Sequence, residues 1–271
     1  MKAIVPAAGL GTRMLPFSAA AAKELVPLGT RPVIQWTLAE AAAVGVDEAA
    51  VVVSPAKKGL RKFLEGELPE AYSRFEAARE WLRLLESVRV RVVEQPEPTG
   101  LGDALLRARA VLAGESYYLM YPDNVVADGP ALFTDLNKTY ASLDICIVAC
   151  KADKPYFRGS NFVIPGWHTD DAFFVESLTR RDDPQPSNIA WRAAGRVIVS
   201  DEYFAALEEA RQRAEGESRE LDDIDAYDAL AAAQRLLCLP PSVPIFDAGS
   251  PEGYAEAWTA FLDGSLRPPS S

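Results

Sequence analysis

Strand-length apolar runs alternate with helix-length periodic runs along the first half of the chain. We expect strands at residues 2–6, 50–53, 88–93, 117–121 and 145–149, and helices at 32–44, 70–87, 101–112 and 130–142. Strands and helices that alternate at this spacing predict βαβ units. The expected fold class is therefore α/β, with a doubly wound, mixed but mainly parallel sheet.

The second half of the chain shows shorter apolar runs. We expect strands at 160–164, 173–178, 193–199 and 236–246, the last interrupted by prolines, and helices at 201–214, 223–235 and 251–262. No repeat and no convincing linker divides the chain. We therefore expect a single domain over residues 1–265, followed by a frayed Pro/Ser-rich tail at 266–271.

Composition limits the classes of function. With 49 % hydrophobic residues, the 271-residue chain has enough apolar side chains for a sizeable core. No apolar run reaches the ~18 residues of a membrane span, and the first run is too short for a signal peptide. The net charge of −11 argues against sequence-independent nucleic-acid binding. Phosphate ligands remain possible, because they need only a few local positive groups.

Cysteine and histidine counts narrow the chemistry further. The three cysteines, Cys146, Cys150 and Cys238, are an odd number without metal-site spacing. We expect them to be reduced core residues of a cytoplasmic protein. The single histidine, His168, argues against His-based triads and His-rich zinc sites.

The segment VPAAGLGTRMLPFSAAAAK, residues 5–23, follows the first expected strand. Gly9 and Gly11 admit positive φ, and successive amides in such a turn make a concave anion site. Arg13 adds a charged donor fork that suits phosphate. The segment is neither a Rossmann fingerprint, because Met14 replaces the third glycine, nor a Walker A motif. A tight turn with a solvated arginine is the alternative interpretation.

The strings G-L-G-T-R-M-L-P, K-E-L-V-P-L and R-P-V-I-Q closely resemble the signature of bacterial UTP–glucose-1-phosphate uridylyltransferases, also called UDP-glucose pyrophosphorylases. These enzymes belong to the sugar-1-phosphate nucleotidyltransferases. The resemblance implies a Rossmann-like, nucleotide-diphospho-sugar transferase-like fold, with nucleotide binding in residues 1–150 and sugar binding in 151–265. It also implies that the triphosphate contacts Ala8, Gly9, Gly11, Thr12, Arg13 and Lys23, the last two as catalytic groups.

Further matches follow in the order of the family. EQPEPTGLGDA, from residue 94, looks like the base-reading segment and implies that Gln95 and Gly100 contact the base. YPDN implies that Asp123 binds Mg²⁺, which prefers hard oxygen ligands. FDAGS implies a second metal ligand at Asp247, although a helix cap near Ser250 explains the same residues.

The sugar side matches less well. The resemblance implies that Glu176 and Asn188 contact the sugar. The family has V-E-K-P where this chain has Val175-Glu176-Ser177-Leu178, so the lysine expected on the sugar phosphate is replaced by Ser177. On the nucleotide side, Ala19 replaces a lysine and Asp103 replaces a histidine. This pattern favours a different sugar phosphate, a slower enzyme or a loss of activity.

The implied reaction is nucleotidyl transfer from UTP or dTTP to a sugar-1-phosphate, with glucose-1-phosphate as the main candidate, Mg²⁺ as cofactor and pyrophosphate as the second product. The alternatives are a non-catalytic or altered-specificity nucleotide-binding homologue, and a transferase acting on a non-sugar phosphate or alcohol. A Rossmann dehydrogenase is disfavoured, because Ser54 and Pro55 stand where its acidic ribose ligand would end the second strand. We further expect a cytoplasmic homo-oligomer without nucleic-acid or membrane partners.

Overall fold

The computed structural model of the chain describes residues 1–152, 162–180 and 191–269. Its strands are β1 (Lys2–Pro6), β2 (Pro27–Leu28), β3 (Arg31–Pro32), β4 (Glu48–Val53), β5 (Arg89–Glu94), β6 (Ser116–Met120), β7 (Asn124–Val126), β8 (Cys146–Ala152), β9 (Val163–His168), β10 (Phe173–Leu178), β11 (Trp191–Ser200), β12 (Leu236–Leu239) and β13 (Ile245–Asp247). Its α-helices are α1 (Phe17–Ala20), α2 (Val33–Ala43), α3 (Lys58–Leu64), α4 (Glu76–Ser87), α5 (Leu101–Val111), α6 (Gly129–Leu143), α7 (Asp201–Glu217), α8 (Ile224–Ala232) and α9 (Pro251–Asp263).

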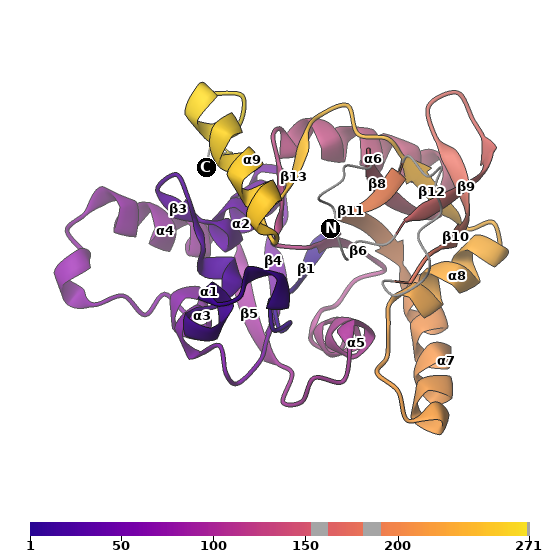
Figure 1. Cartoon of the computed structure of the whole chain (residues 1–271), viewed down its shortest axis with the longest axis horizontal. Coiled ribbons are helices and arrows are strands. Elements are labelled where there is room, and N and C mark those ends of the chain that lie inside the picture. The colour runs from indigo at the N-terminus through magenta and orange to yellow at the C-terminus, as the bar shows by residue number, and fades with distance from the viewer. Residues whose placement is uncertain (153–161, 181–190, 270–271) are drawn as a thin grey trace.

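Nine strands form the central sheet, in the order β5-β4-β1-β6-β11-β8-β12-β10-β9 (Figure 1). The β5-β4-β1-β6 part is parallel, as is the β8–β12 pair. β11 is antiparallel to β6 and β8, and β10 is antiparallel to β12 and β9. Of the described strands in this sheet, only β10 and β11 therefore oppose the others. This confirms the predicted α/β class with a mixed, mainly parallel sheet.

Helices cover both faces of the sheet, as the doubly wound prediction requires (Figure 1). In β1, Ala3 and Val5 enter one core cluster and Ile4 enters the other. The first cluster contains residues of α2, α3, α4 and α6, and the second contains residues of α5, α7 and α8. A parallel strand buried on both faces needs a continuous apolar run, which explains why β1 and β4 are so apolar.

A third core cluster lies under α9. It joins Trp36 of α2, Phe246 of β13 and Ala257 of α9. Leu266 belongs to the same cluster and is 1 % exposed. The predicted frayed tail is therefore wrong for Leu266, because α9 carries the chain end back over this apolar surface.

Two predicted elements are divided in the structure. The helix expected at 70–87 begins only at Glu76, after a 3-10 turn at Glu70–Tyr72. The later part is stabilised because Trp81 stacks on Phe63 at 4.2 Å between ring centroids, whereas Tyr72 is 55 % exposed. The strand expected at 236–246 divides at its prolines into β12, in the central sheet, and β13, which pairs with β7.

The cysteines are buried, as predicted, but two of them are paired. Cys150 and Cys238 form a disulfide with Cα atoms 6.1 Å apart, and Cys146 is free. The expectation of three reduced cysteines is therefore wrong for this pair. The insertion of β12 beside β8 makes neighbours of residues 88 positions apart, which a count of cysteines could not indicate.

No helix within the described residues combines the length and the apolar character that crossing a membrane requires.

Candidate functional site

The glycine loop after β1 turns back toward Lys23. Gly11 has φ 71° and precedes a 3-10 turn at Thr12–Met14. A Cβ at Gly11 would lie 3.1 Å from Cδ of Lys23. Glycine is therefore required here by both the backbone conformation and the close approach of the lysine. Gly9 has open space around it, and Ala8 is half-buried beside it.

Two cations and two carboxylates meet beside this loop. Nη1 of Arg13 lies 2.8 Å from Oδ2 of Asp247, and its Nη2 lies 3.5 Å from Oδ2 of Asp123. Nζ of Lys23 lies 2.5 Å from the same Asp123 oxygen. Four predicted site residues from distant parts of the sequence therefore form one cluster, which we call the charge cluster.

Strand pairing explains why the two carboxylates are close. β13 pairs with β7 so that Asp247 lies opposite Asn124, the neighbour of Asp123 in sequence. The amide of Ala248 then donates to the carbonyl of Asp123 at 2.7 Å. Ser250 also caps α9 by accepting from the amide of Gly253 at 3.3 Å. The helix cap and the place of Asp247 in the charge cluster therefore occur together.

Gly249 is part of this arrangement, although our sequence interpretation assigned it no role. A Cβ at this position would lie 2.5 Å from Oδ2 of Asp123 and 2.9 Å from Nη2 of Arg13. Only glycine lets the chain pass so close to the charge cluster. The D-x-G pattern at residues 247–249 is the sequence signal that could have identified this glycine.

Lys23 remains cationic within the charge cluster. Burial lowers its pKa, but the negative charges of Asp123 and Glu24 outweigh burial, so the net pKa lies above its ordinary value. A cation fixed at the carboxyl ends of β1 and β6 lies where open α/β sheets bind their ligands. The positive charge of this ammonium group suits a phosphate ligand.

Lys57 is a second half-buried cation that our sequence interpretation missed. Its Nζ donates to the carbonyl of Ala7 at 2.7 Å and to both oxygens of Glu24 at 2.8 and 2.9 Å. Glu24 is 1 % exposed. Lys57 thereby ties the start of the glycine loop to the residue that follows Lys23. No local pattern in the sequence marks this lysine.

Arg196 holds the turn that carries Asp123. It is fully buried and pairs with Glu40 at 3.0 and 2.6 Å. It also donates to the carbonyls of Tyr121 at 2.9 Å and Asn124 at 2.7 Å. The structure therefore places this arginine beneath the Asp123 turn.

The expected base-reading residues lie at the ends of β5 and α5. Gln95 follows β5, and Gly100 precedes α5 with φ 104°. A Cβ at Gly100 would lie 2.2 Å from the carbonyl oxygen of Leu221, so only glycine fits. Nε2 of Gln95 donates to the Gly100 carbonyl at 2.8 Å and to Asp103 at 2.9 Å.

The sugar-side residues are less well connected. Glu176 lies exposed on β10, and its side chain makes no hydrogen bond or ion pair to any described residue. Ser177 is half-buried and pairs with Ile164 of β9. Arg180 follows β10 and pairs with Asp225 at 2.5 Å. Asn188 lies outside the residues that the structure describes.

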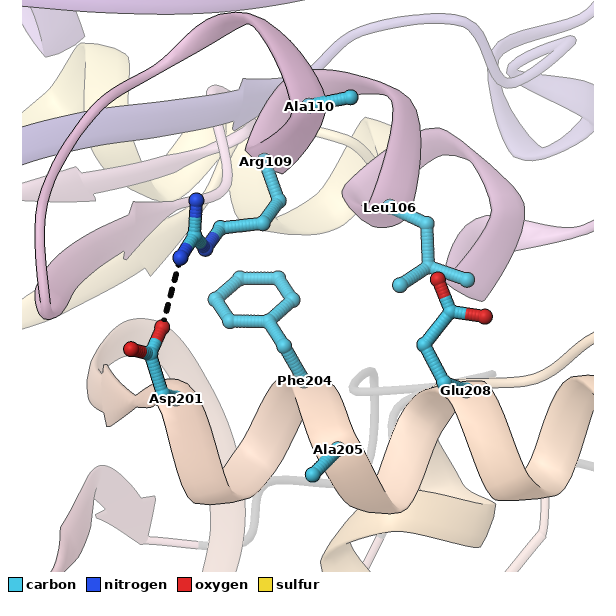
Figure 2. A pocket seen from close by; sticks show the side chains of 7 residues that line it. All are labelled: Leu106, Arg109, Ala110, Asp201, Phe204, Ala205 and Glu208. Carbon is cyan, nitrogen blue, oxygen red and sulfur yellow. Dashed lines mark hydrogen bonds and ion pairs between the residues drawn. The ribbon is translucent and has the colours of Figure 1, made fainter.

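Figure 2 shows a pocket between α5 and α7, where the guanidinium of Arg109 lies above Phe204 and pairs with Asp201 at 2.8 Å. None of the predicted site residues lines this pocket. The charge cluster and the base-reading segment, rather than this pocket, form the candidate site.

A buried carboxyl lies behind the Asp123 turn. Tyr121 donates its hydroxyl hydrogen to Asp223 at 2.7 Å, and Asp223 is 3 % exposed. Burial is the largest cause that raises the pKa of Asp223 well above its ordinary value, and Asp222 raises it further. The folded protein therefore binds a proton here that the unfolded chain releases at lower pH.

We expect Asp223→Asn to remove a pH dependence of stability. The stability that the bound proton contributes is complete below the unfolded pKa and is lost as pH rises toward the folded pKa. As pH rises within that window, the free energy of unfolding of the variant should therefore increase relative to that of the wild type by up to about 1.4 kcal/mol per pH unit. Urea unfolding of both proteins at pH 4.5, 6 and 8 measures the difference. A difference independent of pH would contradict the prediction, and Asp171→Asn, at an exposed aspartate, is the control.

Comparisons with known proteins agree with this geometry. The family model described as nucleotidyl transferase matches residues 2–155. A UTP–glucose-1-phosphate uridylyltransferase of Streptococcus pneumoniae is 30 % identical, over 99 % of this chain and 91 % of the relative. One from Streptococcus pyogenes is also 30 % identical, over 93 % and 86 %.

Solved structures show the same relationship. A crystal structure of a UDP-glucose pyrophosphorylase complexed with UDP-glucose superposes with a TM-score of 0.81 at 25 % identity, covering 97 % of this chain and 98 % of that one. The resemblance inferred from the sequence is thereby confirmed. The chain therefore belongs to the nucleotidyl transferase family and, within it, to the UTP–glucose-1-phosphate uridylyltransferases.

Proposed function

We propose that this protein transfers the uridylyl group of UTP to glucose-1-phosphate, giving UDP-glucose and pyrophosphate, with dTTP as a second possible donor. The observation that carries the proposal is the charge cluster of Arg13, Lys23, Asp123 and Asp247 beside the glycine loop. The names of the relatives support the same reaction.

The reaction needs positioning and charge neutralisation more than acid–base groups. A phosphate oxygen of glucose-1-phosphate attacks the α-phosphorus of UTP, and the bond to the β-phosphate oxygen breaks as pyrophosphate leaves. Arg13 and Lys23 neutralise the charge that develops on the phosphates. The attacking phosphate is already ionised at neutral pH, so no histidine base is required.

Asp123 and Asp247 fit a magnesium ion. Both offer the hard oxygen donors that Mg²⁺ prefers, and both lie within 3.5 Å of the Arg13 guanidinium, which brings the two carboxylates together. The described residues contain no cluster of three or more candidate metal ligands, so water and phosphate oxygens would complete the coordination. When bound, the ion would neutralise the negative charge of the triphosphate.

We assign the remaining predicted residues to the two substrates. Ala8, Gly9, Gly11 and Thr12 would hold the triphosphate, and Gln95 and Gly100 would contact the base. Glu176 and Asn188 would contact the sugar. A non-catalytic or altered-specificity nucleotide-binding protein remains the second candidate, because Ser177 replaces the lysine expected on the sugar phosphate.

Pyrophosphate release across a substrate panel tests the proposal. UTP, dTTP, CTP, ATP and GTP are each combined with glucose-1-phosphate and other sugar-1-phosphates, with and without Mg²⁺. We expect release with UTP or dTTP, glucose-1-phosphate and Mg²⁺. Faster turnover with a purine triphosphate would contradict the nucleotide assignment. Binding of UTP without turnover of any sugar phosphate would favour the non-catalytic candidate.

We expect Ser177→Lys to improve the use of glucose-1-phosphate. A charge-assisted contact to phosphate contributes about 1.5–3 kcal/mol, so KM should fall about ten- to a hundredfold. Initial rates at saturating UTP measure this, with Ser177→Ala as the control. If the wild-type KM is already micromolar, another cation has replaced the lysine and the prediction is wrong.

The organisation of the molecule also remains a proposal. We propose a single nucleotidyltransferase domain over residues 1–265, which is supported by strands of both halves sharing one sheet. The homo-oligomeric state and the cytoplasmic location stay predictions.

A further inference from the structure

The Gln95 side chain is held in one orientation at the edge of the sheet. Gln95 is 6 % exposed, and its backbone amide donates to the carbonyl of Val53 at 2.9 Å. This bond fixes the residue at the carboxyl ends of β4 and β5, where α/β sheets bind ligands. The side-chain amide can then present either its oxygen or its nitrogen to a ligand, and its surroundings decide which.

Protein acceptors occupy both hydrogens of the Gln95 amide nitrogen. Nε2 lies 2.8 Å from the carbonyl oxygen of Gly100 and 2.9 Å from Oδ2 of Asp103. The hydroxyl oxygen of Thr99 is a third, longer contact at 3.3 Å. An amide nitrogen has two hydrogens, so none remains for a ligand. Within the described residues, Oε1 of Gln95 accepts no hydrogen bond, so the oxygen is the atom left to a ligand.

The carboxylate of Asp103 enforces this orientation. It accepts from Thr99 at 2.5 Å and from Nε of Arg107 at 2.7 Å. Burial raises the pKa of Asp103, but its hydrogen bonds outweigh burial and hold the pKa below its ordinary value. An ionised carboxylate can only accept. Turning the amide over would therefore bring its oxygen against two acceptors, the carboxylate and the Gly100 carbonyl.

We infer that Asp103 determines the base specificity of the enzyme, by fixing Oε1 of Gln95 as an acceptor that selects a base with an imino N–H. Uracil and thymine carry this hydrogen at N3, whereas N3 of cytosine is an acceptor and would face the glutamine oxygen unpaired. Asp103 is a positioning residue and does not itself touch the base. The inference rests on the proposed function, in which Gln95 contacts the base.

Nucleotide binding by the full-length protein tests the inference. Dissociation constants for UTP, CTP and N3-methyl-UTP are measured by calorimetry with Mg²⁺, for the wild type and Asp103→Asn. We expect the wild type to bind UTP at least about tenfold more tightly than CTP or N3-methyl-UTP, both of which lack the imino hydrogen. In Asp103→Asn the neutral amide can donate to a turned Gln95, and the Gly100 carbonyl alone still opposes that orientation, so the UTP-to-CTP ratio should fall at least about threefold.

Glu94→Gln is the matched control. It removes one negative charge from the residue before Gln95, at a half-exposed carboxylate that pairs with Arg61 at 2.6 Å. This variant should keep the wild-type ratio. An unchanged ratio in Asp103→Asn, or equal wild-type affinity for UTP and N3-methyl-UTP, would overturn the inference while leaving nucleotide binding intact. Absence of UTP binding by the wild type would instead overturn the proposed function.

Discussion

Lys23→Ala is expected to lower kcat for pyrophosphate release at least about a hundredfold. The ammonium group lies 2.5 Å from Asp123, within the charge cluster that we assign to the phosphates. Loss of one electrostatic donor to a developing charge typically costs about 3 kcal/mol of transition-state stabilisation. The rate is measured at saturating UTP, glucose-1-phosphate and Mg²⁺, and circular dichroism verifies that the variant is folded.

Lys62→Ala is the control, because Lys62 is an exposed lysine on α3. It should leave the rate unchanged. Arg13→Ala should lower the rate in the same direction as Lys23→Ala, since Arg13 also pairs with a carboxylate of the cluster. If the kcat of Lys23→Ala is within threefold of the wild-type value, the prediction is wrong and Lys23 has no catalytic role.

Arg196→Met is expected to lower the free energy of unfolding by about 3–5 kcal/mol. Removing the guanidinium would leave the carboxylate of Glu40 buried without its partner, and breaking a buried ion pair from one side costs about this much. The carbonyls of Tyr121 and Asn124 would lose their donor as well. Urea unfolding measures the change, and a loss below about 1 kcal/mol would contradict the prediction.

A double variant separates the buried charge from the packing. Glu40→Leu combined with Arg196→Met removes both charges, and replacing a buried pair by apolar side chains is often close to neutral. The double variant should therefore recover much of the stability that Arg196→Met loses. The double variant should not recover the full rate of pyrophosphate release, because the Asp123 turn would still lack the donors that hold its carbonyls.

The features with strong signals in the sequence could be predicted before the structure was known. Short apolar runs and periodic helices predicted the βαβ half of the sheet, because a buried parallel strand must be apolar on both faces. The glycine loop, Arg13 and Lys23 lie within one motif. Asp123 and Asp247 were predicted because YPDN and FDAGS resemble segments of the family, and the structure brings both residues to the charge cluster.

Local patterns could not predict the second half of the sheet. Strand β12 inserts between β8 and β10, and β13 leaves the central sheet to pair with β7. Both pairings depend on contacts with strands that are distant in sequence. The helix that begins at Glu76 rather than Glu70 has a similar cause, because packing of Trp81 stabilises only its later part.

The polar side chains that support the site could be identified only from the folded chain. Lys57 reaches the glycine loop from the loop after β4, and Arg196 reaches the Asp123 turn from β11. Gly249 is required because the segment after β13 passes against Asp123. A charged or small residue has the same local signature on the surface and in the interior. Its role follows from burial and from partners that are distant in sequence, and these exist only once the sheet is assembled.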